Sequence, residues 1–595
     1  MQETTGAALT PLPASAHLLE PVLRRFQEEP TRPMVAVRRD GRFVDLTVSE
    51  CYGRIRDLAK GLIGSGVQPG DRVVIMSKTR LEWVLADYAI LAVGAATVPV
   101  YETSSAEQVQ WVVSDSGAVM AIMETGAMRG LLDEGRGDAP ICDDVLVIDD
   151  GGLDALVGRG VDVPDEALDE RIAELTTDTL AAVVYTSGTT GRSKGCVLTH
   201  GNLRTNVRQS IDAVGDMIQP GDVSLLFLPL AHVLTKIITF VGIEAGVKGV
   251  FGTGVPQLPE ELKLVQPTMV VAVPRVFEKV YNTARHTAAS QGKEKIFDRA
   301  ADVAIRWSRE NSSGKSGVLL NLQHALFDRL VYRKLKLAFG GRMRYAISGG
   351  GPLGERLTHF FNGVGVQIFE GYGLTETSPT LTINTFEHWE PGTVGRPVAG
   401  TVLGIAPDGE ILAKGPQVFQ GYWQNDIATK EVKTDDGWFH TGDMGSVDEH
   451  GFVKITGRKK ELLVTAAGKN VAPAPLEDRL RAHPIISQAV VVGDARPFIA
   501  ALLALDEEAI KEWADDHGMS HAVTTELHSN PELLEELQAA VDDANKSVSK
   551  AESIRKFVVL PRDLSVDAGE LTPTLKVRRA VVAKTYAAEI EGLYE

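Results

Sequence analysis

The chain has little cysteine, no long apolar run and a shortage of positive charge, and each lack excludes a class of protein. Only Cys51, Cys142 and Cys196 occur among 595 residues, and they are too far apart for a CxxC metal or dithiol pair. An odd number of cysteines in a long chain is typical of a reducing cytoplasm. No stretch reaches the roughly 18 consecutive apolar residues of a membrane span, and the first residues lack the basic start and apolar centre of a signal peptide. We therefore expect a cytoplasmic protein, with transient peripheral contact with a membrane left open.

The shortage of positive charge bears on the ligands. A net charge of −18 argues against a general nucleic-acid binder, because phosphate backbones need a positive surface. Small anionic ligands remain open, since they need only a local positive pocket. Hydrophobic residues at 44% and charged residues at 24% are ordinary for a globular enzyme, and a chain of this length predicts about two to four structural units.

The order of the predicted elements indicates an α/β fold. A helix at 47–66, capped by Thr47 with Glu50, precedes a strand at 71–76, a helix at 81–92 and a strand at 96–101. Strands joined through helices pair in parallel and need cover on their faces. Further strands are expected at 180–186, 268–273 and 343–348.

Changes in composition divide the rest of the chain. The charged segment of about 278–340 predicts a helical insertion on the sheet, and the alternating apolar positions of about 389–456 predict a small β-barrel-like subdomain. We expect a large N-terminal domain, 1–456, of parallel and mixed sheets covered by helices. A small α+β C-terminal domain, 461–595, follows, with strands at 489–494 and 498–505 and a helical stretch at 525–552.

The sharpest motif is the loop YTSGTTGRSKG, Tyr185–Gly195, directly after an apolar strand. Glycines free its backbone to wrap an anion, and hydroxyls and a lysine supply donors, which is what a polyphosphate needs. The spacing is not that of a Walker A loop, which opposes a P-loop ATPase. A flexible surface linker is the alternative. The candidate ligand residues are Thr186, Ser187, Gly188, Thr189, Thr190, Gly191 and Lys194.

A second motif, FEGYGLTET at Phe369–Thr377, carries two carboxylates. Only Glu376 is flanked by hydroxyls, and a carboxylate beside phosphates is the usual anchor for Mg²⁺. A third, the glycine cluster SGGGPLG at Ser348–Gly354, includes Gly350 and Gly351, which would let the backbone approach a flat ring closely. Taken alone, a solvated acid and a tight strand-to-helix turn are the alternatives for these two motifs.

Together these motifs resemble those of the adenylate-forming superfamily, in particular its long-chain fatty acid–CoA ligase branch, over about Thr47–Arg579. The resemblance implies that the 185–195 loop holds the β- and γ-phosphates of ATP. It also implies that Thr375 contacts the α-phosphate, that Glu376 binds Mg²⁺, and that Gly371 and Tyr372 belong to the adenine site.

The same resemblance extends to the second half of the chain. It implies that Asp443, in WFHTGDMG, and Arg458, in GRKKELLV, bind the ribose. The segment 457–460 would be a hinge with Lys460 at its pivot, and the C-terminal domain a mobile lid. Rotation about this hinge would exchange Lys576, the lysine of the adenylation step, for the face carrying Gly468, which lines the pantetheine channel.

His232, in FLPLAHVLTKI, lies in an apolar segment that we expect to be a strand. The resemblance makes it a positioning residue between the acyl and thiol tunnels, whereas a satisfied core histidine is the alternative. Some long-chain members carry a tryptophan gate four residues later. Here that position is Lys236, so the gate cannot be transferred to this chain.

The resemblance implies a two-step reaction. A fatty acid and ATP would give acyl-AMP and pyrophosphate, and coenzyme A would then give acyl-CoA and AMP. The alternatives are an acyl-AMP ligase that loads a carrier protein and a non-catalytic nucleotide or acyl sensor. The sequence leaves the acid, the oligomeric state (monomer or homodimer) and membrane docking open, and it contains no strongly cationic amphipathic helix of the usual docking kind.

Overall fold

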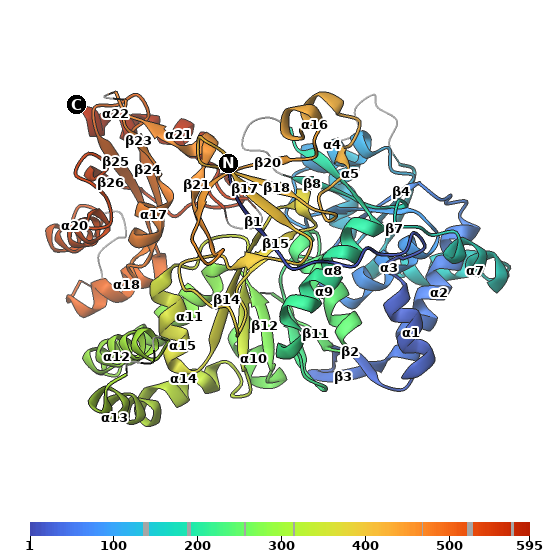
Figure 1. The fold of residues 1–595 in the computed structure, drawn as a ribbon, viewed down its shortest axis with the longest axis horizontal. Coiled ribbons are helices and arrows are strands. Elements are labelled where there is room, and N and C mark those ends of the chain that lie inside the picture. Colours follow the sequence, from blue (N-terminus) through green and yellow to red (C-terminus); the bar gives the residue numbers. More distant parts are fainter. Residues whose placement is uncertain are drawn as a thin grey trace.

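Two large sheets and three small ones form the framework of the described residues. The computed structural model describes residues 1–134, 142–186, 192–254, 257–312, 314, 316–466, 468–519, 527–572 and 576–595. Figure 1 shows the two large sheets in the blue-to-yellow part of the chain and a separate orange-to-red unit at the C-terminal end. The α/β fold expected from the sequence is confirmed.

The first large sheet has seven strands, with a parallel core of the order β8-β5-β4-β6-β7. Two antiparallel strands, β9 and β19, extend it next to β8. The strands are β4 (Arg72–Met76), β5 (Ala96–Val100), β6 (Met120–Met123), β7 (Asp144–Val147), β8 (Leu180–Thr186), β9 (Lys194–Thr199) and β19 (Gly421–Tyr422).

The helices beside this sheet match the predicted pattern. Helix α2 (Val48–Gly64) begins with the expected capping box, in which Thr47 and Glu50 bond each other's backbone amides. Helix α3 (Leu81–Ala92) is buried at every position except Glu82, because it packs against α2 on one side and lies close to the sheet on the other. An all-round apolar composition is what such a position requires.

The second large sheet has nine strands, parallel in its centre and antiparallel at both ends. Helices α8 (His200–Val214) and α9 (Val233–Ala245) contact each other, and α8 touches a strand of each large sheet, so the pair lies between the sheets. The strands are β2 (Pro33–Arg39), β3 (Arg42–Thr47), β10 (Val223–Leu226), β11 (Lys248–Phe251), β12 (Met269–Ala272), β13 (Tyr345–Ser348), β14 (Gln367–Gly373), β15 (Thr380–Ile383) and β16 (Arg396–Pro397).

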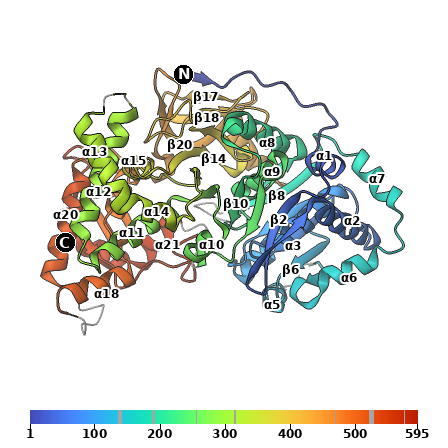
Figure 2. The same ribbon diagram turned by 90° about the horizontal axis from the view of Figure 1, so that it is seen from below.

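Four helical elements occupy most of the segment expected to be a helical insertion. Their inner side chains, among them Phe277, Phe297 and Tyr332, join one apolar core with Phe360 and Phe361 of α15 (Glu355–Val364) and with the strands of the second sheet. The elements are α11 (Pro274–Ala289), α12 (Glu294–Ser312), α13 (Val318–Phe327) and α14 (Arg333–Ala338), with a π-helical turn η4 (Asp328–Tyr332) between the last two. Figure 2 shows α13 at the outer edge of the molecule.

An antiparallel sheet of five strands follows, and it includes the strand at the N-terminus. Its strands are β1 (Gln2–Thr5), β17 (Val402–Ile405), β18 (Glu410–Lys414), β20 (Phe439–Val447) and β21 (Val453–Arg458). This is the region in which the sequence predicts a small barrel-like subdomain, and the strands form an open sheet that positions two candidate ribose ligands.

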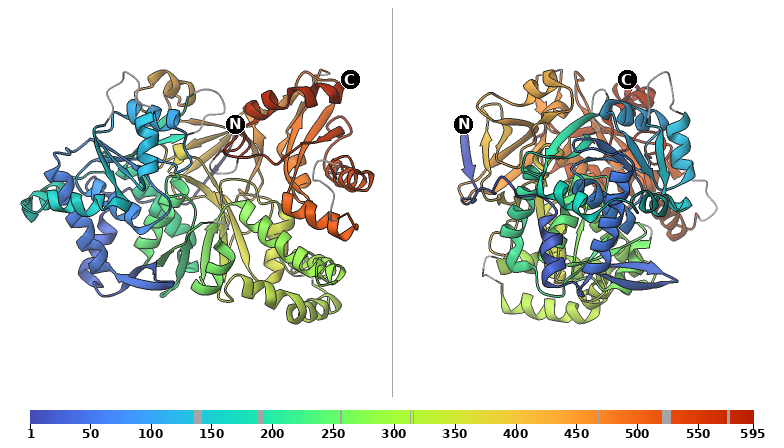
Figure 3. Two further views of the ribbon diagram at one scale, coloured as in Figure 1. Left: turned by 180° about the vertical axis from the view of Figure 1, so that it is seen from behind. Right: turned by 90° about the vertical axis from the view of Figure 1, so that its right-hand side faces the viewer.

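The C-terminal part has two apolar cores of its own around a three-stranded sheet. Its elements include α17 (Ala474–Arg481), β24 (Ile486–Val492), β25 (Ile499–Leu505), α18 (Glu507–Asp516), α20 (Pro531–Asn545) and β26 (Ile554–Val559). It docks on the rest through Arg275, whose guanidinium donates to the carbonyl of Ser487 at 3.0 Å, and through His286 and Glu512, 2.6 Å apart. Figure 3 shows this unit beside the helical segment.

Two expected elements need correction. The helical stretch at 525–552 is shorter in the described residues, because Asn530 caps α20 and Pro531 opens it. His232 lies on no strand: β10 ends at Leu226, the amide of His232 closes a turn onto the carbonyl of Pro229, and His232 is the N-cap of α9. Among the residues described, no helix is both long and apolar enough to cross a membrane.

Candidate active site

Strands β8 and β9 present the two ends of the glycine-rich loop. They pair antiparallel up to Thr186 opposite Lys194, so both ends of the loop lie at one edge of the first sheet. The five loop residues between 187 and 191, namely Ser187, Gly188, Thr189, Thr190 and Gly191, lie outside the described residues. The ammonium of Lys194 lies 5.1 Å from the centre of the Tyr422 ring.

Tyr422 connects this lysine to the candidate Mg²⁺ ligand. Its hydroxyl donates to Oε1 of Glu376 at 2.9 Å, and the carbonyl of Glu376 accepts the amide of Phe419 at 2.8 Å. Glu376 and Thr375 are half-buried in the short turn η5 (Thr375–Thr377), which follows β14. The carboxylate is therefore held in a fixed place at the edge where the loop ends. Tyr422 was not predicted from the sequence, because no local pattern marks it.

The candidate ribose ligands lie opposite each other on adjacent strands. Asp443 on β20 faces Arg458 on β21, and the two form an ion pair in which Nε of Arg458 lies 2.7 Å from Oδ1 of Asp443. The hydroxyl of Tyr372 donates to Oδ2 at 2.7 Å. Burial raises the pKa of Asp443, although Arg458 opposes that rise. Each carboxylate oxygen keeps a lone pair, so the group can still accept hydrogen bonds from a diol.

The glycine cluster forms a turn between β13 and α15. Gly350 has φ of +80°, a conformation that glycine adopts without strain. Glu370 holds this turn: its carboxylate, buried at 5% exposure, accepts the amide of Leu353 and the hydroxyl of Thr358, both at 3.0 Å. Burial raises the pKa of Glu370. This explains why only one carboxylate of the FEGYGLTET motif is free for a ligand.

The remaining glycines of the nucleotide set lie close to their neighbours. A Cβ on Gly371 would lie 3.3 Å from the carbonyl oxygen of Thr382, and one on Gly349 would lie 3.3 Å from Cδ2 of Leu234. A Cβ on Gly351 would lie 3.7 Å from Cγ of Pro274. The strand end thus approaches β15 closely at Gly371, and the turn approaches α9 closely at Gly349, whereas Gly351 makes only an ordinary contact with α11.

His232 begins α9 beside this turn, and its Nδ1 accepts the amide of Leu234 at 3.1 Å. Burial and, to a smaller extent, the charge of Lys576 lower the pKa of His232 to about 3. A ring that accepts at Nδ1 and is neutral carries its proton on Nε2. His232 is therefore a neutral donor at physiological pH.

Lys576 reaches this site from the C-terminal part of the chain. A bridge between Leu571 and Val577 and the amide of Lys576, which donates to the hydroxyl of Thr572 at 3.0 Å, hold it in a hairpin. Desolvation and the charge of Arg458 lower the pKa of Lys576, while Asp443 and two glutamates, Glu461 and Glu376, oppose this. The side chain is nevertheless exposed to solvent, so the protein shields its ammonium only in part.

The expected hinge and pantetheine residues lie elsewhere in the C-terminal part. Lys460 is in the turn η6 (Lys459–Glu461), directly after β21. Gly468 has φ of +77° in an exposed turn, and a Cβ added there would meet no atom within 4 Å. In this arrangement the structure brings Lys576, His232, Glu376 and Asp443 into one electrostatic group and leaves Gly468 at the surface.

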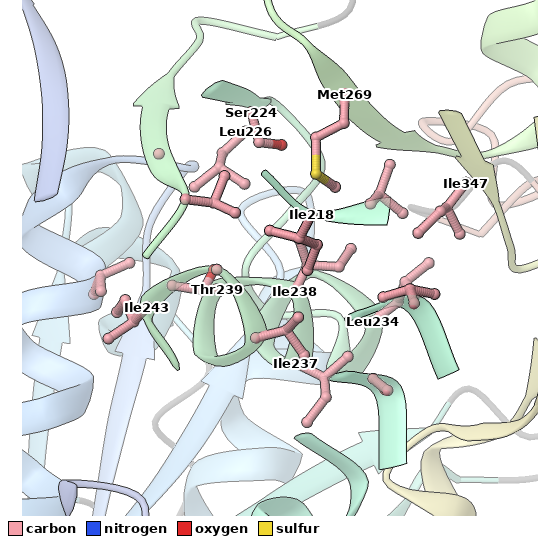
Figure 4. A pocket seen from close by; sticks show the side chains of 18 of the residues that line it. Ile218, Ser224, Leu226, Leu234, Ile237, Ile238, Thr239, Ile243, Met269 and Ile347 are labelled. Carbon is pink, nitrogen blue, oxygen red and sulfur yellow. The ribbon is translucent and has the colours of Figure 1, made fainter. Parts of the chain in front are cut away.

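An apolar cavity lies along α9, the helix that His232 begins. It lies between α9 and the strands of the second large sheet, and Figure 4 shows Ile238 and Leu234 on the side of Met269 and Ile347. Leu234 is two residues from His232 and touches the glycine cluster at Gly349. Gly249 and Val35 line the cavity at β11 and β2.

The candidate phosphate loop, the half-buried Glu376 near its ends, the buried Asp443 and Lys576 from the C-terminal part are the residues expected of an adenylate-forming enzyme, and an apolar cavity lies beside them. Residues 23–423 match the AMP-binding enzyme family, and residues 460–595 match the AMP-binding enzyme C-terminal domain. The chain belongs to the AMP-binding enzyme family.

Among curated proteins, the chain is 52% identical to the long-chain-fatty-acid–CoA ligase FadD15 of Mycobacterium tuberculosis over 559 residues, 93% of each chain. It is 32% identical to the long-chain-fatty-acid–CoA ligase ACSBG2 of Gallus gallus, over 94% of this chain and 79% of that one. Among solved structures, the adenylation domain of a carboxylate reductase from Mycobacterium chelonae has a TM-score of 0.75 at 21% identity, over 97% of this chain and 91% of that one. A Mycobacterium tuberculosis fatty acyl CoA synthetase has a TM-score of 0.63 at 20% identity, over 96% and 99%.

Proposed function

We propose that this protein is an AMP-forming long-chain fatty acid–CoA ligase. One observation carries the proposal: the polar site that suits ATP lies beside an apolar cavity, because Leu234 lines the cavity and lies against Gly349 of the glycine cluster. A fatty acid needs both environments, because its carboxylate must reach the nucleotide while its chain leaves water. The identity to curated long-chain ligases supports the same substrate class.

In the first step, a carboxylate oxygen of the fatty acid attacks the α-phosphorus of ATP, and pyrophosphate leaves with the electron pair of the broken P–O bond. The reaction needs positioning and charge neutralisation more than covalent help. We assign Lys576 to the fatty acid carboxylate and the α-phosphate, and Thr375 to the α-phosphate. The loop from Thr186 to Lys194 would hold the β- and γ-phosphates, and Asp443 with Arg458 the ribose.

The residues present fit a Mg²⁺ ion that arrives with ATP. Glu376 is oriented by Tyr422 through one oxygen, and no cationic side chain pairs with Glu376 within the described part of the chain. The described residues contain no group of three or more potential metal ligands, which agrees with a metal held by one carboxylate and the substrate phosphates. When bound there, Mg²⁺ would neutralise part of the phosphate charge.

In the second step, the thiol of coenzyme A, as thiolate, attacks the acyl carbon, and AMP leaves with the electrons of the acyl–oxygen bond. The thiol proton passes to solvent. We propose that residues 461–595 rotate about the hinge 457–460 between the steps, which withdraws Lys576 and brings Gly468 toward residues 1–456. The neutral His232, at the start of the helix that lines the cavity, would position the acyl group by donating from Nε2.

The test is the release of pyrophosphate and AMP from Mg-ATP with a series of acids from short to long, each with and without coenzyme A. Turnover that rises with chain length and depends on coenzyme A is the expected result. Acid-dependent pyrophosphate release that ignores coenzyme A would instead make the protein a ligase that loads a carrier protein. No release with any acid would leave only a nucleotide or acyl sensor. Glu376→Gln is the matched inactive control.

A further inference from the structure

The outer face of the continuous helical segment α13, η4 and α14 is apolar and exposed. Such exposure is uncommon among the other described residues. Six of the sixteen large apolar side chains that are exposed among the described residues fall within residues 318–337. We define the leucine face as five of them, spaced three, four or seven residues apart as one side of a helix requires. These are Leu319, Leu322, Leu326, Leu330 and Leu337, which are 51–71% exposed.

The opposite face of the same helices is firmly packed, so the exposure does not come from a loosely placed segment. Leu320 and Tyr332 are buried, and the hydroxyl of Tyr332 donates to the carbonyl of Ala300 at 2.7 Å. The ring of His324 stacks on Trp307 at 4.0 Å and its Nε2 lies 2.6 Å from the carbonyl oxygen of Gly363. The leucines therefore project outward from a rigid support.

Positive charge surrounds the leucine face. Residues 318–342 contain one acid, Asp328, and five bases, in a chain whose net charge is −18. Asp328 pairs with Arg333 and Lys336, whereas Arg329 and Lys334 are exposed and, within the described part of the chain, have no acidic partner. The five bases are Arg329, Arg333, Lys334, Lys336 and Arg342.

We propose that the leucine face docks on the surface of an anionic lipid bilayer. Apolar side chains on one face of a helix, with cations at their sides, are the arrangement that enters the boundary between acyl chains and acidic headgroups. Long basic side chains can keep their charge at the headgroup level while their stems remain apolar. Figures 1 and 2 show α13 at an outer edge of the molecule, where it can meet a flat surface.

The charges favour a bilayer over a second copy of the chain. A self-complementary contact through this face would bring two basic segments together, each with Arg329 and Lys334 lacking an acidic partner. Like charges across an interface oppose association. An anionic headgroup layer instead complements both the cations and the leucines. This inference does not rest on the proposed ligase activity, since it concerns binding alone.

The test is co-sedimentation of the full chain with phosphatidylcholine vesicles, with and without phosphatidylglycerol. We expect binding that requires phosphatidylglycerol and weakens as salt is added. The variant Leu322→Ser/Leu326→Ser should weaken it by about tenfold or more, because the side chains that leave water are gone. Arg329→Glu/Lys334→Glu should remove the dependence on phosphatidylglycerol. The control Val161→Ser/Ile427→Ser alters side chains that are 73% and 77% exposed elsewhere and should bind as the parent does.

Two further measurements make the result decisive. The variant Leu322→Trp, compared with the parent and its seven tryptophans, should show an added shift of emission to shorter wavelength on phosphatidylglycerol vesicles, which reports insertion rather than loose adsorption. Light scattering of the free protein tests self-association. Absence of binding to both vesicles overturns the proposal. So does equal loss in the control variant, or a dimer that dissociates in the Leu322→Ser/Leu326→Ser variant without vesicle binding in the parent.

Discussion

The buried ion pair between Lys236 and Asp87 allows a stringent test of how the cavity is supported. Lys236 is on α9, 1% exposed, and its ammonium contacts the carboxylate of Asp87 on α3. The rings of Trp83 and Phe240 each have their centres 5.3 Å from that ammonium. Asp87 also accepts the hydroxyl of Thr97 on β5 at 2.5 Å. The pair thus ties a wall of the cavity to the first large sheet.

Lys236→Met retains most of the apolar stem and removes the charge. Asp87 is 2% exposed, and of its two side-chain partners among the described residues only the Thr97 hydroxyl then remains. Removal of one member of a buried pair costs about 3–5 kcal/mol, because the other charge remains desolvated. Replacement of both, as Asp87→Leu/Lys236→Met, should be close to neutral for the same reason. Ile237 and Ile238, the next two residues of α9, line the cavity. The single variant should therefore also raise KM for the acid.

The assay is urea unfolding of the parent, both single variants and the double variant, followed by tryptophan fluorescence and circular dichroism. A double-mutant cycle then isolates the coupling between the two side chains. The reasoning fails if Lys236→Met loses less than about 1 kcal/mol, since a broken buried pair cannot be so mild. It also fails if the double variant loses the sum of both singles, because the two groups would then act independently.

Three further predictions address the site and its surroundings. Lys576→Ala should abolish pyrophosphate release but retain thioester formation from supplied acyl-AMP, and equal loss of both half-reactions would contradict its assignment to adenylation alone. Gly249→Ile should lower kcat/KM for the longest acids more than for medium ones, because a Cβ there already lies 3.2 Å from Leu226 at the cavity wall; a uniform loss across a chain-length series would argue against this. Acid should destabilise the protein through His200 and His232, whose pKa values burial lowers to about 3. The unfolded chain takes up these protons near pH 6.5, whereas the folded chain does not. The free energy of unfolding is therefore unaffected above that pH and falls below it, toward pH 3, by up to about 1.4 kcal/mol per pH unit per histidine. Thermal unfolding from pH 7 to 4 should show a smaller loss of stability in His200→Gln than in the parent.

The polar half of the site could be predicted because its residues occur in short motifs at strand ends. Thr186 with Lys194, Glu376, and Asp443 with Arg458 each stand within a run of glycines and hydroxyls, and the paired strands bring these runs to one edge. Local composition marks the loop and Glu376. The roles expected of Asp443, Arg458 and Lys576 came only from the resemblance to a family.

The sequence could not predict contacts between residues that are far apart in the chain. Tyr422 orients Glu376 from 46 positions away, and Lys236 meets Asp87 across 149 positions. At the sequence level, Lys236 was only a residue that replaces a tryptophan gate. The strand expected at His232 was wrong because a turn at Pro229 ends the extended segment and begins α9. An apolar run alone does not distinguish these outcomes.

The leucine face was hidden from the sequence for a related reason. Residues 318–337 are apolar on both sides of the helix, so periodicity does not separate the leucines that pack inward, such as Leu320, from those that face solvent. The charges of the same segment predicted only a helical insertion on the sheet. Only the packing of α12 and α15 against one side shows which side chains remain uncovered.

Placement of charge, more than its total, determines which anions this protein can bind. A net charge of −18 repels polyanions at long range, yet Lys194, Arg458 and Lys576 stand around the proposed nucleotide site, and Arg329 and Lys334 beside the leucine face. Each cluster stands beside a feature that fits one kind of anion: a shaped site for one nucleotide, or apolar side chains for a lipid surface. Long-range repulsion and short-range attraction together therefore select the ligand that fits the local geometry. On this reasoning, reversal of charge at Arg329 and Lys334 should alter vesicle binding while turnover with a water-soluble acid stays at the parental rate.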